Sequence, residues 1–202
     1  MKLSKFFIIA SVALCISSTF LSGQSQDTCK TLIKPFGFGL HIEQFKLNDI
    51  TDLNDAPANK LIFTYSPNCH FRIEPELGFR FNNDKTSNTK TNGVFYSLGI
   101  FGMVQHNKLN LYSGLRLEYD NIQSKSNNDI INGVALNNTT NRFMIGPVLG
   151  GEYFLGNNFT LGAEVAIKYV TLKKTYSVPN QDENDNSNYF MTDSGLFLRF
   201  YF

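Results

Sequence analysis

The end of the chain constrains its fold more than any other stretch. From Tyr189 to Phe202 it reads YFMTDSGLFLRFYF. Because side chains alternate between the two faces of a strand, one face carries Leu196, Leu198, Phe200 and Phe202. The opposite face carries Gly195, Phe197, Arg199 and Tyr201. The sequence therefore predicts a final strand with one continuous apolar face that ends on an aromatic residue.

The beginning of the chain indicates export. Lys2 and Lys5 precede an apolar run over 6–16, which small and polar residues follow. This order is typical of a secretory signal peptide, and the run is too short for a membrane-spanning helix. We expect residues 1–24 to be a signal peptide that is cleaved.

The rest of the chain offers little for nucleic acid to bind and no helix that could cross a membrane. Without Lys2 and Lys5 the formal net charge changes from +1 to −1, and no basic patch stands out. No apolar run of about 18 residues remains. Because lipid offers backbone groups no hydrogen-bond partners, a closed barrel is the remaining way to span it.

Seven further stretches alternate apolar residues with polar or small ones, which is the pattern of strands. They cover 36–47, 60–65, 70–81, 93–104, 109–119, 142–154 and 159–171. Together with the final strand they predict eight strands. Pro75 lacks a backbone N–H and predicts a bulge or a local break in pairing.

The connections between these strands alternate in length. Long polar segments cover 48–59, 82–92, 120–141 and 172–188, and short turns cover 66–68, 105–108 and 156–158. If neighbouring strands are antiparallel, all the long segments lie at one rim and all the turns at the other. Outer-membrane barrels have external loops and short periplasmic turns in this arrangement.

The chain resembles the small eight-stranded outer-membrane β-barrels, typified by the outer membrane protein A transmembrane domain and its porin-family relatives. The resemblance covers Phe36 to Phe202 and rests on the connection pattern and the closing strand GLFLRFYF. It implies an all-β fold, an eight-stranded antiparallel up-and-down transmembrane β-barrel over 36–202. A periplasmic lead-in over 25–35 would precede the barrel, and both termini would be periplasmic.

The same resemblance assigns a role to the closing strand. In that family the barrel-assembly machinery reads a terminal aromatic strand as its assembly signal, which here comprises Leu196, Leu198, Phe200 and Phe202. The chain contains no Trp, so Tyr and Phe would have to form the aromatic belts at the two membrane surfaces.

With the apolar rows facing lipid, the second rows place six acids and six bases inside the barrel. They are Glu43, Arg72, Glu74, Glu76, Arg80, Arg116, Glu118, Arg142, Glu152, Glu164, Lys168 and Arg199. Eight strands leave an interior just wide enough for side chains, and buried charges persist when they are paired. We expect a closed, salt-bridged interior; a gate or a polar ligand site is the alternative.

Alternation alone also fits a soluble, lipocalin-like barrel with its apolar rows inside. The leader, the terminal Phe202 and the alternation of loop lengths favour lipid outside.

Two cysteines, Cys29 and Cys69, remain after the leader. Disulfides persist in exported proteins. Both cysteines lie on the periplasmic side of the predicted topology, so a disulfide between them is possible, and two free thiols are the alternative.

Catalysis by a lipid A-modifying barrel enzyme would need a nucleophile beside a base. His41 and Glu43 share a face, but no Ser stands on that face of the same strand. Ser97 and Ser113 would approach His41 only through an unknown register. We therefore expect no enzymatic activity.

We also expect no metal or other cofactor. His70 and His106 fall at predicted turns, and no clustered Cys and His ligands suggest zinc. The acidic segment 180–188 lacks the spacing of a calcium-binding loop.

The sequence thus predicts a non-enzymatic integral outer-membrane protein that presents four polar external loops, with a structural, adhesion or envelope-integrity role. Its expected partners are outer-membrane lipid and the barrel-assembly machinery, and an extracellular partner of the loops is unknown. A lipid A-modifying enzyme or a small-solute porin is the alternative.

Overall fold

The computed structural model describes residues 34–46, 59–84, 89–131, 134–178 and 181–202. The predicted signal peptide over 1–24 and most of the lead-in lie outside these residues. The described residues form eight strands: β1 (Phe36–Lys46), β2 (Asn59–Asn68), β3 (Phe71–Asp84), β4 (Thr89–His106), β5 (Leu109–Ile131), β6 (Val134–Phe154), β7 (Phe159–Val178) and β8 (Gln181–Tyr201). They contain no helix long and apolar enough to cross a membrane.

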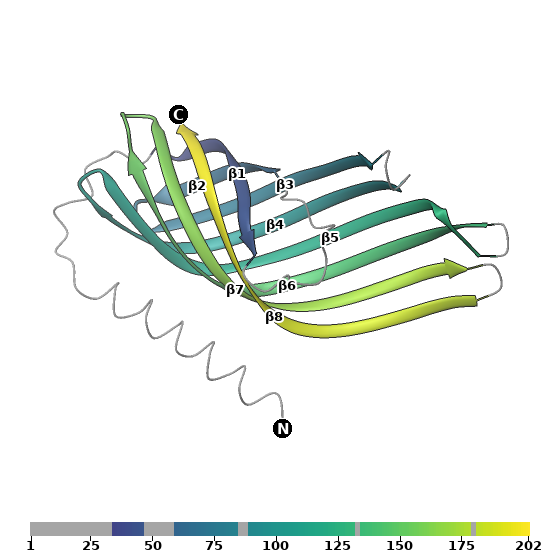
Figure 1. Ribbon diagram of the computed structural model, residues 1–202. Helices are drawn as coiled ribbons and strands as arrows, with labels where there is room; N and C mark the ends of the chain where they lie inside the picture. The colour runs from purple at the N-terminus through teal and green to yellow at the C-terminus, as the bar shows by residue number, and fades with distance from the viewer. Residues whose placement is uncertain (1–33, 47–58, 85–88, 132–133, 179–180) are drawn as a thin grey trace, which may run out of the picture.

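Each strand pairs with its sequence neighbours in antiparallel fashion, and β8 pairs back with β1 to close the barrel (Figure 1). The predicted up-and-down barrel is confirmed. Tight turns join β2 to β3, β4 to β5 and β6 to β7 at one rim. In the β4–β5 turn Asn107 has a φ of 53°, a conformation that asparagine tolerates better than most residues.

The long polar segments contain more strand than the sequence predicted. Asp120 to Asn141, predicted as a loop, is mostly the paired ends of β5 and β6, and Leu172 to Asn188 is mostly the paired ends of β7 and β8. The ribbons of β5 to β8 therefore run well past the end of β1 in Figure 1. Apolar alternation marks a strand only where one face is buried, so a polar extension paired through its backbone gives no such signal.

Pro75 breaks pairing on one side without a bulge. It pairs with Leu98 of β4, and the β3–β4 register continues unbroken through it. On the other side the pairs of β2 with β3 jump from Ile62↔Glu76 to Tyr65↔Ile73, which keeps the same register. The predicted break in pairing is confirmed, and the alternative of a bulge at this position is wrong, because the register shift lies at the end of β2.

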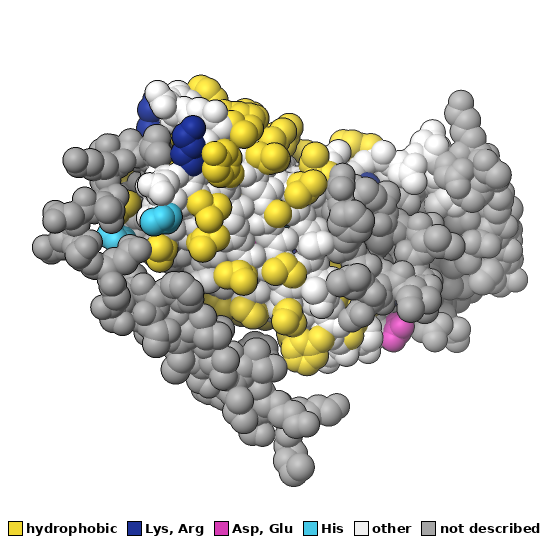
Figure 2. Space-filling view, turned by 60° about the vertical axis from the view of Figure 1, so that its left-hand side comes forward, with side chains coloured by type: hydrophobic (Ala, Val, Ile, Leu, Met, Phe, Trp, Pro, Cys, Tyr) yellow, Lys and Arg dark blue, Asp and Glu magenta, His cyan; other side chains and the backbone are white. Residues whose placement is uncertain are grey.

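Large hydrophobic side chains are exposed on the outer wall of the barrel, and Figure 2 shows many of them spread over one face. Outward aromatic residues recur ten positions apart on four strands: Phe71 and Phe81, Tyr153 and Phe143, Phe159 and Tyr169, and Phe200 and Phe190. At about 3.3 Å per residue and a tilt of about 40°, ten residues span roughly 25 Å. Two aromatic belts of Tyr and Phe therefore enclose a band as tall as the hydrocarbon layer.

Inward glycines leave room for large inward side chains. A Cβ at Gly150 would lie 2.3 Å from the ring of Tyr112, and one at Gly162 would lie 2.1 Å from the ring of Phe197. These rings pack with Phe101, Met103 and other buried apolar residues in the middle of the barrel. The interior is therefore filled by aromatic as well as charged side chains.

Candidate functional site: the charged interior of the barrel

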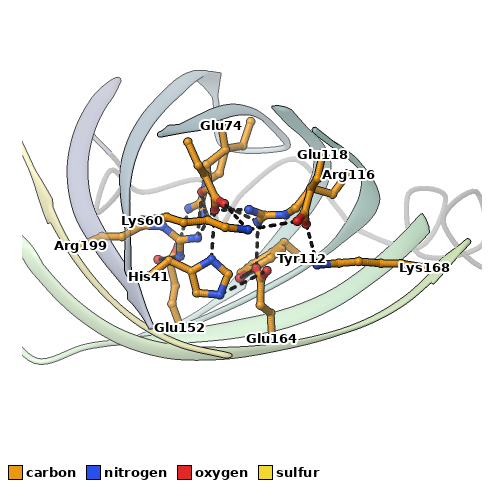
Figure 3. Close-up of polar contacts among 12 residues, drawn as sticks. His41, Lys60, Glu74, Tyr112, Arg116, Glu118, Glu152, Glu164, Lys168 and Arg199 are labelled. Carbon is orange, nitrogen blue, oxygen red and sulfur yellow. Dashed lines mark hydrogen bonds and ion pairs between the residues drawn. The ribbon is translucent and has the colours of Figure 1, made fainter. Parts of the chain in front are cut away.

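Eleven of the twelve charged residues predicted to face inward are buried in the barrel: Arg72, Glu74, Glu76, Arg80, Arg116, Glu118, Arg142, Glu152, Glu164, Lys168 and Arg199. The side chain of the twelfth, Glu43, lies outside the described part of the chain. The eleven buried residues come from β3, β5, β6, β7 and β8, and those labelled in Figure 3 point toward one another inside the barrel.

Arg116 of β5 is the centre of the first group of ion pairs. Its Nη2 atom lies 3.0 Å from Glu74 of β3 and 3.0 Å from Glu164 of β7. Its Nη1 atom donates to Glu76 of β3. One guanidinium thus bridges three carboxylates on β3 and β7, neither of which is paired with β5.

Glu152 of β6 is the centre of a second group, nearer the tight turns. It accepts hydrogen bonds from Arg72 and, at 3.1 Å, from Arg199. The hydroxyl of Tyr201 donates to it at 2.9 Å, and the amide of Asn110 at 2.7 Å. The hydroxyl of Thr160 on β7 also donates to it, at 3.1 Å. Charge-assisted bonds of this kind are stronger than neutral ones, so a single buried carboxylate on β6 links β3, β5, β7 and β8.

A third group lies toward the long ends of the strands. Glu118 of β5 lies 3.0 Å from Lys60 of β2 and 2.6 Å from Lys168 of β7. Lys168 also contacts Asp193 of β8. Beyond these residues Arg142 pairs with Asp120 at 3.0 Å. The space between these side chains is about 10 Å³, which is about one water molecule by the same kind of measure.

Aromatic rings fill the space between the charges. The guanidinium of Arg199 lies 3.6 Å from the ring centroid of Phe197, and that of Arg116 lies 5.3 Å from Phe101. Arg80 lies 5.0 Å from the ring of Phe95. Arginine is well suited to this environment, because its flat cation stacks on rings while it donates to carboxylates.

The sequence prediction missed several members of the interior. Lys60, Asp120 and Asp193 are buried and paired. His41 is buried too, with Nδ1 3.3 Å from Glu76 and Nε2 3.8 Å from Glu164. The period-two pattern of the closing strand, continued two residues before Gly195, would have found Asp193.

The structure does not bring the candidate catalytic residues together. Ser113 lies on the outer face of β5, whereas His41 faces the interior. Ser97 is buried, but its hydroxyl has no hydrogen-bond partner. His70 and His106 lie exposed at the tight turns. Among the described residues no group of three or more His, Cys, Asp or Glu side chains could hold a metal ion.

The closing strand presents its predicted apolar row to the outside of the barrel. Leu196 and Phe200 are exposed and Leu198 is half-buried on β8, which pairs with both β7 and β1, and the exposed Phe202 directly follows this strand.

Of the two cysteines, Cys69 lies in the β2–β3 turn and is disulfide-bonded. Cys29 lies outside the described residues, so its pairing with Cys69 stays a prediction.

A solved structure with a similar architecture identifies the fold. A major outer membrane protein from Thermus thermophilus matches with a TM-score of 0.51 and 11% identity, over 83% of this chain and 99% of that one. This chain has the fold of the small outer-membrane β-barrels. Neisserial surface protein A matches the barrel with a TM-score of 0.48 and 13% identity, over 85% and 98% of the two chains.

The attachment invasion locus protein of Yersinia pestis matches the barrel with a TM-score of 0.48 and 10% identity, over 82% of this chain and 95% of that one. No protein-family model and no curated protein matches the sequence. At these identities the likeness concerns the fold.

Proposed function

We propose that this barrel is a non-enzymatic integral protein of the outer membrane, with a closed, salt-bridged interior and polar segments exposed outside the cell. Its role is structural, adhesive or in envelope integrity. The observation that carries the proposal is the network of buried ion pairs. Arg116, Glu152 and Glu118 each join strands across the interior, where a channel would need open space.

The residues of the outer wall support the proposal that the barrel lies in a lipid bilayer. Apolar side chains lie between the two aromatic belts, and the outward residues become polar just beyond the belt at the long ends of the strands. On β5 Tyr119 is followed outward by Asn121 and Gln123, and on β8 Phe190 is preceded by Asn188 and Asn186. Water therefore meets the strand extensions, and hydrocarbon meets the band below them.

The polar extensions are the part of the barrel available to an external partner. Exposed residues there include Gln123 and Lys125 of β5, Lys173 of β7 and Asn186 of β8. Recognition by proteins is commonly carried by such exposed segments on a rigid scaffold. The barrel presents them on paired strands, which keeps their positions fixed relative to one another.

The remaining parts of the proposal concern export and assembly. Residues 1–24 are a cleaved signal peptide, 25–35 a periplasmic lead-in, and both termini face the periplasm. The barrel-assembly machinery recognises the strand that carries Leu196, Leu198, Phe200 and Phe202. Cys29 pairs with Cys69 at the periplasmic rim.

Fractionation combined with a gel that compares heated and unheated samples tests place and fold together. We expect the processed protein in the outer-membrane fraction, migrating faster before heating than after it. A Cys placed at Gln123 should react with a membrane-impermeant maleimide on intact cells, whereas a Cys placed at Asn157, in the β6–β7 turn, should not. Recovery of the protein dissolved in the periplasm contradicts the proposal.

A separate measurement addresses the enzymatic alternative. Mass spectra of lipid A from cells with and without the protein should be identical. A change in the number of acyl chains that depends on the protein would overturn the non-enzymatic assignment.

A further inference from the structure

The outer wall of the barrel has a groove that the proposed function does not use. It crosses β4 to β7 and has a volume of about 550 Å³, within the roughly 300–1,000 Å³ of ligand pockets. Its lining includes four small outward residues that form the floor: Gly102 of β4, Ser113 of β5, Gly151 of β6 and Ala163 of β7. Parts of the buried residues Tyr112 and Glu164 also line it. Leu111 and Leu149 are largely exposed and form its walls.

The strand register explains why the floor is continuous. Gly102 pairs with Ser113, and Gly151 pairs with Ala163. Leu111 and Leu149 lie opposite Gly151 and Ser113 respectively across the β5–β6 pair. The four small residues thus leave a depression in the wall, and the side chains of Leu111 and Leu149 project beside it.

The aromatic belts place the groove within the apolar band. Leu149 lies four positions from Tyr153 of the belt near the tight turns and six from Phe143 of the other belt. Ala163 likewise lies four positions from Phe159 and six from Tyr169. The centre of the groove is therefore closer to the tight-turn side of the band, and in the proposed orientation it faces the periplasmic leaflet.

The rim below the groove carries one lysine and one histidine. Lys108 lies in the β4–β5 turn, three positions before Leu111, and His106 lies two positions after Val104, which also lines the groove. Both side chains are exposed. The described residues of the three tight turns, 69–70, 107–108 and 155–158, include no Asp or Glu. A phosphate at the membrane surface therefore meets a lysine and no repelling carboxylate.

We propose that this groove holds one acyl chain of a glycerophospholipid from the periplasmic leaflet, with the lipid phosphate against Lys108. The proposal rests on the membrane orientation given under the proposed function. An apolar surface alone does not select one lipid, because the bilayer is as apolar as leucine. A groove can select one lipid, because an acyl chain that lies in it gains dispersion contacts on several sides instead of one. Lys108 at the rim then binds the phosphate of the same lipid.

Filling the groove tests the proposal. A Cβ at Gly102 would meet no atom closer than 3.9 Å, so G102F places a ring in the groove without a backbone clash. Leu98 lies on the same strand, outward and outside the groove, so L98F is the matched control. Both variants are reconstituted in vesicles of phosphatidylethanolamine and phosphatidylglycerol, extracted in mild detergent and examined by native mass spectrometry.

We expect the wild-type protein and L98F to retain one phospholipid and G102F to retain at least about tenfold less. K108Q should retain less phospholipid than the wild type, because the acyl chain still fits the groove but the lipid phosphate no longer has the lysine to pair with. Equal retention by G102F and the wild type overturns the proposal. So does a wild-type dimer that G102F converts to a monomer, since a second copy would then be the occupant.

The membrane assignment and the groove fail in different ways. A protein that does not insert into vesicles contradicts the proposed function itself. A protein that inserts, shows the heat-dependent gel shift and keeps its phospholipid in G102F contradicts only the groove.

Discussion

Arg199, on the last strand, lies 2.8 Å from the carboxylate of Glu74 on β3, across the interior of the barrel. The same guanidinium donates to Glu152 of β6. The closing strand is therefore held by charges in the interior as well as by backbone pairing with β1 and β7. Arg199 therefore lies on the strand that closes the barrel and also pairs with the buried carboxylates of Glu74 and Glu152.

Arg199→Met should destabilise the barrel strongly. It removes a buried cation that Glu74 and Glu152 share, and breaking a buried pair by removing one partner costs about 3–5 kcal/mol. Urea unfolding of the refolded barrel in detergent micelles measures the change in the free energy of unfolding. Lys173→Met, at an exposed site on β7, is the control and should stay within about 0.5 kcal/mol of the wild type. Equal effects of the two substitutions would mean that the interior charges contribute nothing to closure.

Gly150→Ala should destabilise the barrel through a single contact. The three nearest atoms to the new methyl group all belong to the Tyr112 side chain, the closest at 2.3 Å. Overpacking of this kind costs about 1–3 kcal/mol. Gly102→Ala, which meets nothing closer than 3.9 Å, should unfold at nearly the same urea concentration as the wild type. If both variants unfold at the wild-type urea concentration, the Tyr112 side chain can move away from a methyl group at position 150, and the 2.3 Å clash is relieved at no cost.

Leu115→Arg tests where the bilayer lies on the barrel. Leu115 is exposed on the outer wall of β5, four positions from the belt residue Tyr119. A charge near the middle of the bilayer costs about 2–4 kcal/mol, and one at its surface about 0–1 kcal/mol. Gln123→Arg lies four positions beyond Tyr119 on the same strand and should cost little. Unfolding in lipid vesicles separates the two, and a neutral Leu115→Arg would place this wall in water.

The disulfide of Cys69 can be assigned chemically. Peptides from the unreduced, processed protein should include one in which Cys29 is linked to Cys69, and reduction should release both. Two alkylated free thiols before reduction would reject the pairing.

The sequence predicted which side chains face the interior, because that follows from the period of two along each strand. It did not predict which of them contact one another, because that depends on strand register. Counting alternate residues along each strand identified Arg72, Arg116 and Glu152 as inward. It could not say that Arg116 meets Glu74, Glu76 and Glu164, because that depends on the relative shifts of three strands.

Two other features were hidden for different reasons. Phe101 and Met103 fill the interior from β4, and apolar residues on both faces of that strand made its inward row hard to recognise. On the described parts of the extensions the outward residues are polar, for example Asn121 and Gln123 of β5 and Asn186 and Asn188 of β8. Hydrophobic periodicity therefore ends just beyond the aromatic belt, although the strands continue.

Electrical recording from planar lipid bilayers tests the proposed closed interior most directly. The purified, refolded barrel should insert and leave the membrane without stable conductance steps, because ion pairs and aromatic rings occupy the path between the two rims. Large, stable steps from the wild-type protein would contradict the account and favour a small-solute porin.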